Sequence, residues 1–244
     1  YFTEYVRKYS DMPFLVELEA REDGSFVPGK QLRASDFEGA MGQDNNPEWK
    51  TVAWDELSDR LVVPNGSIGF RWGEKEENQG KWNLEQRDAE GNDVHLLLTL
   101  AENHDDVAKV AFPYFGGIAH EHFDHVAGNE LLFHSLPAKR LTKADGTDIL
   151  AVTVFDLMCA NYGIDRGFGK EGEDDGATSY DQIRPYTPAW QEKITGVPAE
   201  QVARIAREFA DNADKTRGRS MVIVGAAMNH WYHMDMNYRG LINM

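Results

Sequence analysis

One short stretch, Ser220-Met221-Val222-Ile223-Val224-Gly225, carries the most information on the fold class, because an apolar run of this length predicts a buried β-strand. A loop, Gly225–His233, follows it, and a helix is expected from about Met234 to the end. Before it, another helix is predicted to begin at Pro198. The apolar stripe of that helix consists of Val202, Ile205, Ala206 and Phe209. Helix, strand, loop and helix in this order are typical of a parallel α/β layer.

Two further helices are expected in the last third of the chain. Apolar residues recur at helical spacing before Gly163, a typical residue just past a helix end. They are Val152, Phe155, Cys159 and Tyr162. After the acidic, glycine-rich loop Gly167–Gly176, Thr187-Pro188 has the form of an N-cap followed by a proline in the first turn.

The first 150 residues are β-rich after a short helical start. The helix is expected to stop at Asp11-Met12-Pro13, and a buried strand follows at Phe14–Leu18. Further short strands are expected between turn signals, at Trp49–Trp54, Arg60–Val63, Ser67–Arg71, Trp82–Gln86 and Val94–Leu100. We therefore predict a mixed α/β fragment in three parts. These are the end of an α/β layer at 1–20, a β-rich insertion at 21–150, and at 151–244 a helical segment leading into a Rossmann-like, nucleotide-binding-like strand–helix layer.

The composition excludes several classes of function. The 244 residues carry a net charge of −16, which disfavours nucleic acid as a partner, since that affinity needs clustered Lys and Arg. No apolar run approaches the ~20 residues of a membrane helix, so no direct membrane insertion is expected. Cys159 is the only cysteine, which rules out an internal disulfide and a self-contained iron–sulfur cluster. On an apolar helix face, Cys159 is interpreted as a small core residue. The ending Leu241–Met244 has no helix stop, as expected for a piece of a longer polypeptide.

The stretch His120-Glu121-His122-Phe123-Asp124-His125 matches the pattern with which some metal-dependent hydrolases bind one or two ions. Imidazoles suit zinc, and an aspartate suits a second ion that activates water. The strand before it is weak, however, and a further histidine at a suitable distance is missing: His134 is too near and His230 too far. We therefore favour a solvated loop and keep a hydrolase using His120, His122, Asp124 and His125 as the alternative.

Two other clusters could bind ligands. The loop Gly225–His233 follows a predicted strand and precedes a helix, where backbone N–H groups favour anions. The alternative is a plain turn whose Trp231 and His233 pack inside. The stretches Gly69–Lys75 and Lys81–Arg87 place tryptophans beside cations, which could line an anion path or a partner surface but more often form part of a β layer's core.

Long stretches of the sequence, in order along the chain, resemble the alpha subunits of membrane-bound respiratory nitrate reductases, members of the dimethyl-sulfoxide-reductase-like molybdenum enzymes. They are 45–53, 64–75, 80–88, 177–181, 186–190, 194–197, 204–216 and 229–241. The resemblance implies an internal fragment of such a subunit and part of a molybdopterin-oxidoreductase fold. It also disfavours the zinc site, because only Glu121-His122-Phe123 of that motif belongs to the family pattern.

The resemblance implies that the parent protein reduces nitrate to nitrite at molybdenum held by two molybdopterin guanine dinucleotides, with a 4Fe-4S cluster ligated outside this fragment. The implied partners are an iron–sulfur beta subunit and a membrane cytochrome b gamma subunit. The implied location is peripheral, on the cytoplasmic side of the membrane, in nitrate assimilation, anaerobic respiration and electron transport.

Within the fragment, the resemblance implies that Gly225, Asn229, His230 and Trp231 lie near the cofactor, with His230 hydrogen-bonded to cofactor or substrate oxygen. Ala227 departs from the family pattern, which has glycine there, and its methyl group could hinder close backbone approach. The family's iron–sulfur ligands, metal-ligating aspartate and C-terminal cofactor domain have no counterpart here. The isolated chain is therefore expected to be inactive and to hold no cofactor or metal. A docking module for the iron–sulfur subunit is the further alternative.

Overall fold

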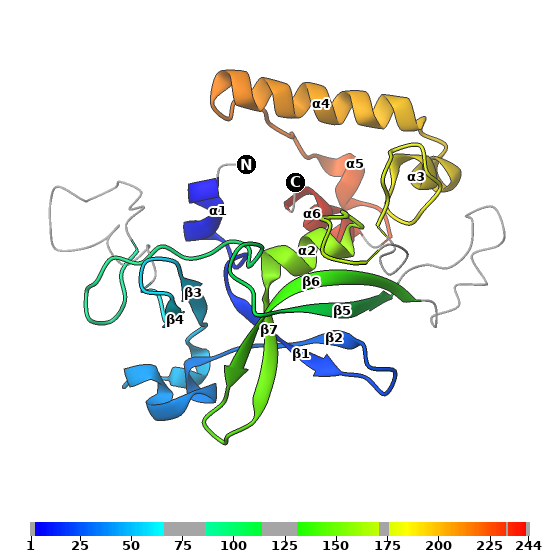
Figure 1. Cartoon of the computed structure of the whole chain (residues 1–244). Coiled ribbons are helices and arrows are strands. Elements are labelled where there is room, and N and C mark those ends of the chain that lie inside the picture. Colours follow the sequence, from blue (N-terminus) through cyan, green and yellow to red (C-terminus); the bar gives the residue numbers. More distant parts are fainter. Residues whose placement is uncertain (1–2, 66–85, 114–130, 171–175, 233, 243–244) are drawn as a thin grey trace, which may run out of the picture.

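Five strands with apolar inward-facing residues close into a small β-barrel, seen in the lower part of the computed structural model in Figure 1. The structure describes residues 3–65, 86–113, 131–170, 176–232 and 234–242. The barrel strands are β1 (Leu15–Ala20), β2 (Phe26–Gln31), β5 (Asp106–Pro113), β6 (Leu131–Thr142) and β7 (Asp148–Thr153). They follow one another around the barrel in this order, and β7 pairs back with β1.

All neighbouring strands of the barrel are antiparallel except β2 and β5, which run parallel and share the single register pair Phe26–Val110. Gly29 on β2 sits where β1 crosses closely. A Cβ atom at this position would lie 2.9 Å from the carbonyl oxygen of Glu17 and 2.8 Å from Cγ of Glu19. Glycine therefore permits the tight strand crossing, as it commonly does at barrel corners.

Helix α2 (Val154–Asn161) continues directly from β7 and packs against the barrel. Thr153 is its N-cap, and its Oγ1 accepts a hydrogen bond from the backbone N–H of Asp156. One face of the helix adds Ala160 to a core formed by the barrel. The other members of that core are Leu18, Ala108, Val110, Phe112, Leu136, Ala138 and Val152. The helix predicted to end at Gly163 is thus confirmed.

Cys159 is a core residue of α2, as predicted. It is buried together with Leu98 and Phe155. This burial raises the pKa of the Cys159 thiol, because the thiolate loses its hydration. A buried thiol held in its neutral form is a poor nucleophile, which agrees with the interpretation of Cys159 as a packing residue.

A second, two-stranded sheet of β3 (Ala53–Asp55) and β4 (Arg60–Val62) lies beside the barrel. The strand predicted at Arg60–Val63 is confirmed as β4. The strand predicted at Trp49–Trp54 is confirmed only at its end, because β3 begins at Ala53 and Trp49 belongs to the 3-10 helix Pro47–Trp49. The predicted strand Val94–Leu100 forms no regular strand, but it does run alongside β3. There the backbone N–H of Leu97 donates to the carbonyl of Trp54 at 2.9 Å. Alternate residues of this stretch, Val94, Leu96, Leu98 and Leu100, are all buried.

The described part of the N-terminal half also contains one α-helix and three short 3-10 helices. They are α1 (Thr3–Tyr9), η1 (Ala34–Asp36), η2 (Glu38–Gly42) and η3 (Pro47–Trp49). As predicted, α1 stops before Pro13. The strand predicted at Ser67–Arg71, and the part of Trp82–Gln86 before residue 86, lie outside the described residues. The three-part division with boundaries at residues 20 and 150 stays a prediction. Strand β1, which ends at the first boundary, and strand β7, which spans the second, are hydrogen-bonded neighbours.

The buried carboxylate of Asp55 fixes the turn after β3. It accepts hydrogen bonds from the backbone N–H of Ser58 at 2.9 Å and of His95 at 2.6 Å, and from Oγ of Ser58 at 2.5 Å. Burial is the largest single influence and raises the pKa of Asp55. The hydrogen bonds together outweigh burial, and they hold that pKa below its usual value of 3.8.

We expect this carboxylate to make stability depend on pH in the acid range. Because the folded pKa is lowered, the contribution of Asp55 is complete above the unfolded pKa and is lost as pH falls below about 3.8 through the folded pKa. Urea unfolding from pH 6 to pH 2 should therefore show a shallower acid loss in Asp55→Asn than in the parent chain. Equal pH slopes for the two proteins would contradict this assignment.

Four helices lie in the described part of the C-terminal third. They are α3 (Pro188–Thr195), α4 (Ala199–Thr216), α5 (Ala226–Asn229) and α6 (Met234–Ile242). The cap at Thr187 is confirmed, since its Oγ1 accepts from the backbone N–H of Trp190 at 3.1 Å. Helix α3 ends at Gly196 with a φ of 73°, the left-handed conformation that glycine allows. None of the described helices is both long and apolar enough to cross a membrane.

The predicted strand Ser220–Gly225 is not formed. Residues 219–225 have no regular secondary structure, and residues 221–225 are exposed. The apolar stripe on α4 is not buried either, because Ile205 is exposed and no residue of this helix is fully covered. An apolar run specifies that a strand should be buried, but a parallel strand also needs neighbours, and the described residues supply none here. The helices and strands together still confirm the mixed α/β class.

Candidate functional site at the turn 225–231

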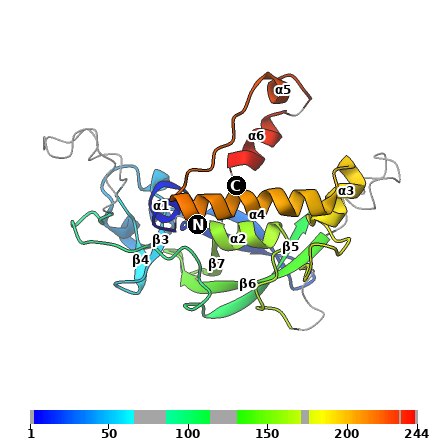
Figure 2. The same ribbon diagram turned by 90° about the horizontal axis from the view of Figure 1, so that it is seen from above.

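The four residues predicted to lie near a cofactor come together on one turn. Gly225 precedes α5, Asn229 ends this helix, His230 is its C-cap, and Trp231 follows. Figure 2 shows this turn at the tip of an arm that leaves α4 and points away from the barrel. All four residues are exposed, so the alternative in which Trp231 packs inside the chain is wrong. His233 and the side chain of Ala227 lie outside the described set.

The turn offers two hydrogen-bonding side chains. Asn229 presents an amide and His230 an imidazole, and residues 220–232 contain no Asp, Glu, Lys or Arg. These groups suit the polar edges of a ring-bearing cofactor. Ligand sites that hold such molecules bury most of their surface, however, so the opposite walls must come from elsewhere.

Gly225 has no steric requirement within this chain. Its φ of −137° is ordinary extended backbone, and a Cβ atom there would meet nothing within 4 Å. Helix α5 is also only four residues long, so its aligned peptide dipoles add little to anion binding. Gly225 is the N-cap of α5, where the strand–loop–helix pattern placed it, and anion binding at this N-terminus stays a prediction. The side-chain groups that the turn can offer a ligand are the amide of Asn229 and the imidazole of His230.

The other predicted ligand sets cannot be placed. His120, His122, Asp124 and His125 all fall outside the described residues, as do most of Gly69–Lys75 and Lys81–Arg87. Within the described ranges, no group of three or more His, Cys, Asp or Glu side chains could hold a metal ion.

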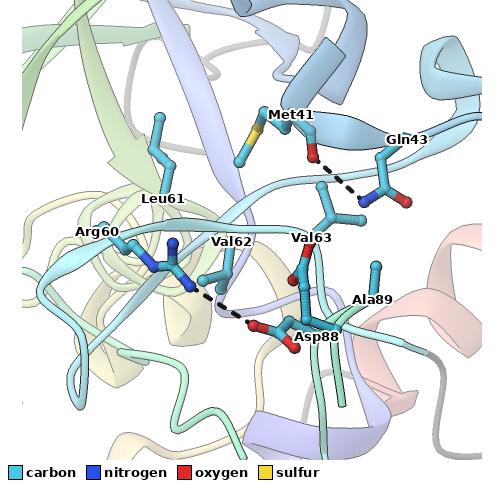
Figure 3. A pocket seen from close by; sticks show the side chains of 9 residues that line it. Met41, Gln43, Arg60, Leu61, Val62, Val63, Asp88 and Ala89 are labelled. Carbon is cyan, nitrogen blue, oxygen red and sulfur yellow. Dashed lines mark hydrogen bonds and ion pairs between the residues drawn. The ribbon is translucent and has the colours of Figure 1, made fainter. Parts of the chain in front are cut away.

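A hollow that sequence reasoning missed lies between β4 and the turns around residues 42 and 89, and has a volume of about 290 Å³ (Figure 3). Its walls are Met41, Gln43, Arg60, Leu61, Val62, Val63, Asp88, Ala89 and Glu90. A guanidinium nitrogen of Arg60 lies 3.6 Å from the buried carboxylate of Asp88. Glu90 adds a further negative charge, so the hollow has no net attraction for an anion such as nitrate.

A buried carboxylate in α2 organises a second feature that the sequence analysis did not single out. Asp156 accepts hydrogen bonds from Oγ1 of Thr99 at 2.6 Å, from N–H of Leu100 at 3.0 Å and from Oγ1 of Thr153 at 2.8 Å. It also forms an ion pair with Arg166. The spacing Thr153-x-x-Asp156 is typical of a helix start, and this is the one signal that could have indicated the site. The cluster ties three separate segments together, which is a structural role.

Comparison with known proteins gives a consistent assignment. No protein-family model matches the chain. The chain is 60% identical to the respiratory nitrate reductase 1 alpha chain of Escherichia coli over 245 residues, which is 100% of this chain and 19% of that protein. It is 41% identical to the nitrate reductase alpha chain of Bacillus subtilis over 244 residues, again 100% of this chain and 18% of the relative.

A more distant similarity covers less of the chain. The perchlorate reductase subunit alpha of Dechloromonas aromatica is 42% identical over 55 residues, 22% of this chain. The two nitrate reductase alpha chains above, by contrast, match the whole sequence. The chain therefore belongs to the nitrate reductase alpha-chain family and is a fragment spanning about 19% of the length of its Escherichia coli relative.

Proposed function

We propose that this segment works as part of the alpha subunit of a respiratory nitrate reductase, which reduces nitrate to nitrite. The observation that carries the proposal is the 60% identity to such an alpha chain over the whole segment. In the complete protein a molybdenum centre held by two molybdopterin guanine dinucleotides would supply the two-electron chemistry. The overall reaction consumes two electrons and two protons, and yields nitrite and water.

In this proposal the chain helps to position the cofactor or substrate and donates hydrogen bonds to it. Asn229 and His230 are exposed and adjacent at the end of α5, so the Asn229 amide and an N–H of the His230 ring can donate to oxygen atoms of a cofactor or substrate brought against the turn. Gly225 leaves open space where a Cβ would otherwise stand, and Trp231 offers a flat apolar face. The remaining walls of the site would come from the rest of the alpha subunit.

The wider assembly follows from the same family membership. The partners would be an iron–sulfur beta subunit, which brings the electrons, and a membrane cytochrome b gamma subunit, which holds the complex at the cytoplasmic side of the membrane. A 4Fe-4S cluster would be ligated outside this segment. The isolated chain would be inactive, because one exposed turn cannot hold a cofactor of this size. No observation favours the metal-dependent hydrolase.

The role of His230 can be tested in a full-length Escherichia coli alpha subunit that carries this segment in place of its own. His230→Ala should lower nitrate reduction by about 10²-fold, the usual effect of removing one preorganised donor, while the subunit accumulates normally. His104→Ala is the matched control, because His104 is an exposed histidine elsewhere in the chain. Nitrite formation and molybdenum content should be measured together. Full activity in His230→Ala would remove this residue from the site.

Metal content of the isolated chain tests the rest of the proposal. After dialysis against a mild chelator, elemental mass spectrometry should find neither stoichiometric zinc nor molybdenum. One or two zinc ions per chain, lost in His122→Ala and Asp124→Ala, would instead establish the hydrolase. Retained molybdenum would show that this segment binds the cofactor without the other walls.

A further inference from the structure

The chain reverses direction at the end of α4, shortly before the turn 225–231. Arg217, the C-cap of this helix, has a φ of 56° and a ψ of 52°, a left-handed conformation that is uncommon for a residue other than glycine. Backbone groups close the helix. The N–H of Gly218 donates to the carbonyl of Ala213 at 2.7 Å, and the N–H of Arg217 donates to the carbonyl of Asp214 at 3.4 Å. The helix end therefore needs no side chain to close it.

Three side chains nevertheless make a further set of hydrogen bonds at this reversal. Oγ1 of Thr216 accepts from the N–H of Arg219 at 3.1 Å and donates to the carbonyl of Asn212 at 2.5 Å. Nδ2 of Asn212 donates to the carbonyl of Arg219 at 3.0 Å and to Oγ of Ser220 at 2.9 Å. Oγ of Ser220 donates in turn to the carbonyl of Phe209 at 2.7 Å. We call Asn212, Thr216 and Ser220 the exit clamp.

The exit clamp holds one residue of the backbone through both of its polar groups. The N–H of Arg219 is bound by Thr216, and its C=O is bound by Asn212. Each hydroxyl of the clamp donates once and accepts once, so the bonds do not compete for the same hydrogen. Because both groups of Arg219 are held by the same helix, the clamp sets the direction in which the chain leaves α4.

The exit direction matters because the candidate site lies only a few residues further along the chain (Figure 2). Gly225 follows Ser220 by five residues, which is about 17 Å in an extended chain. A change of about 10° in the exit direction would move Gly225 by about 3 Å over that length. Catalysis tolerates smaller errors than this, since a misplacement of about 1 Å can lower a rate by about 10²-fold.

We propose that Asn212 and Thr216 are positioning residues for the turn 225–231, and that they act through the backbone of Arg219. The proposal rests on the proposed function, because the group that it places for the reaction is His230. Within the described residues, no side chain of the exit clamp belongs to a hydrophobic core cluster. Removing its hydrogen bonds should therefore redirect the chain without unfolding it.

The full-length Escherichia coli alpha subunit carrying this segment provides the test. Thr216→Val removes the hydroxyl and keeps the shape, whereas Thr216→Ser keeps the hydroxyl. Asn212→Ala removes both amide donors and does not weaken the helix, because alanine favours helix more than asparagine does. The matched control is Thr195→Val at the end of α3, which leads to α4 and not to the turn. Oγ1 of Thr195 makes the same kinds of bond, to the carbonyl of Gln191 at 3.0 Å and from the N–H of Val197 at 3.1 Å.

Two measurements distinguish positioning from a purely structural role. Hydrogen exchange of the amides at 226–232 should be at least about tenfold faster in Thr216→Val and Asn212→Ala than in the parent subunit. The kcat per bound molybdenum should fall at least about tenfold in both variants, with the KM for nitrate unchanged. Thr216→Ser and the Thr195→Val control should match the parent in both measurements.

Three results would overturn the proposal. They are unchanged exchange and kcat in both variants, a Thr216→Ser protein as defective as Thr216→Val, and a lower molybdenum content with unchanged kcat per molybdenum. His230→Ala separates this proposal from the proposed function. If His230→Ala is inactive while Thr216→Val and Asn212→Ala match the parent, only the exit-clamp proposal fails. If His230→Ala is fully active while the clamp variants still speed exchange at the turn, the role of His230 fails and the control of the turn by the clamp stands.

Discussion

Asp156→Asn is expected to lower the free energy of unfolding by about 3–5 kcal/mol, the usual effect of breaking a buried ion pair from one side. The side chain of Asp156 is fully buried, and it accepts hydrogen bonds from three residues besides its ion pair with Arg166. An asparagine keeps the shape of the side chain but removes its charge. The N–H groups of its amide would face the O–H and N–H donors of the residues that now bond to the carboxylate. The partly buried Arg166 then loses its counter-charge.

Urea unfolding followed by circular dichroism measures this effect. Asp106→Asn is the matched control, because Asp106 pairs with Arg140 at the surface, where an ion pair contributes about 0–1 kcal/mol. A double-mutant cycle with Arg166→Met then isolates the coupling of the buried pair. If Asp156→Asn cost no more than the surface control, the cluster would not be what joins α2 to the segments around residues 99 and 166.

Leu15→Ala should cost about 2–5 kcal/mol, because it removes a large side chain from a core that cannot collapse to fill the space. Leu15 is fully buried at the start of β1, among the apolar residues that join the barrel to the 3-10 helices. Its backbone is held on both sides. Its N–H donates to the carbonyl of Val52 at 3.0 Å, and its carbonyl accepts from the N–H of Leu32 at 2.9 Å.

The comparison for this variant is Leu57→Ala, which removes the same atoms from an exposed position and should change stability by less than about 0.5 kcal/mol. Both proteins are to be unfolded in urea at the same pH. Equal midpoints would mean that the packing around Leu15 is loose enough to close over the missing atoms.

Local signals in the sequence predicted the local structure. Thr187-Pro188 and Gly163 marked helix ends correctly. The barrel could not be predicted in this way. Its closure depends on pairs such as Leu18–Leu150 and Phe26–Val110, whose members lie far apart along the chain, and no periodicity encodes which strands meet.

The candidate site was predicted only in part. The sequence placed Gly225, Asn229 and His230 on one turn, and the structure has them there. The burial predicted for the preceding strand was wrong, because an apolar run does not show whether neighbouring strands are available, and the described residues supply none at Met221–Val224. Asp156 was missed for a related reason: a polar residue on an apolar helix gives no sign that Thr99 and Arg166 will meet it.

The pairing of β1 with β7 limits how early the barrel can form during protein synthesis. The first strand of the barrel to be synthesised needs the last one as its neighbour, so the barrel cannot close before Thr153 has left the exit tunnel. At about 5–20 residues per second, the stretch from Ala20 to Asp148 takes on the order of ten seconds to make. During that interval β1 and β2 can pair with each other, but one edge of each strand stays unpaired on the nascent chain.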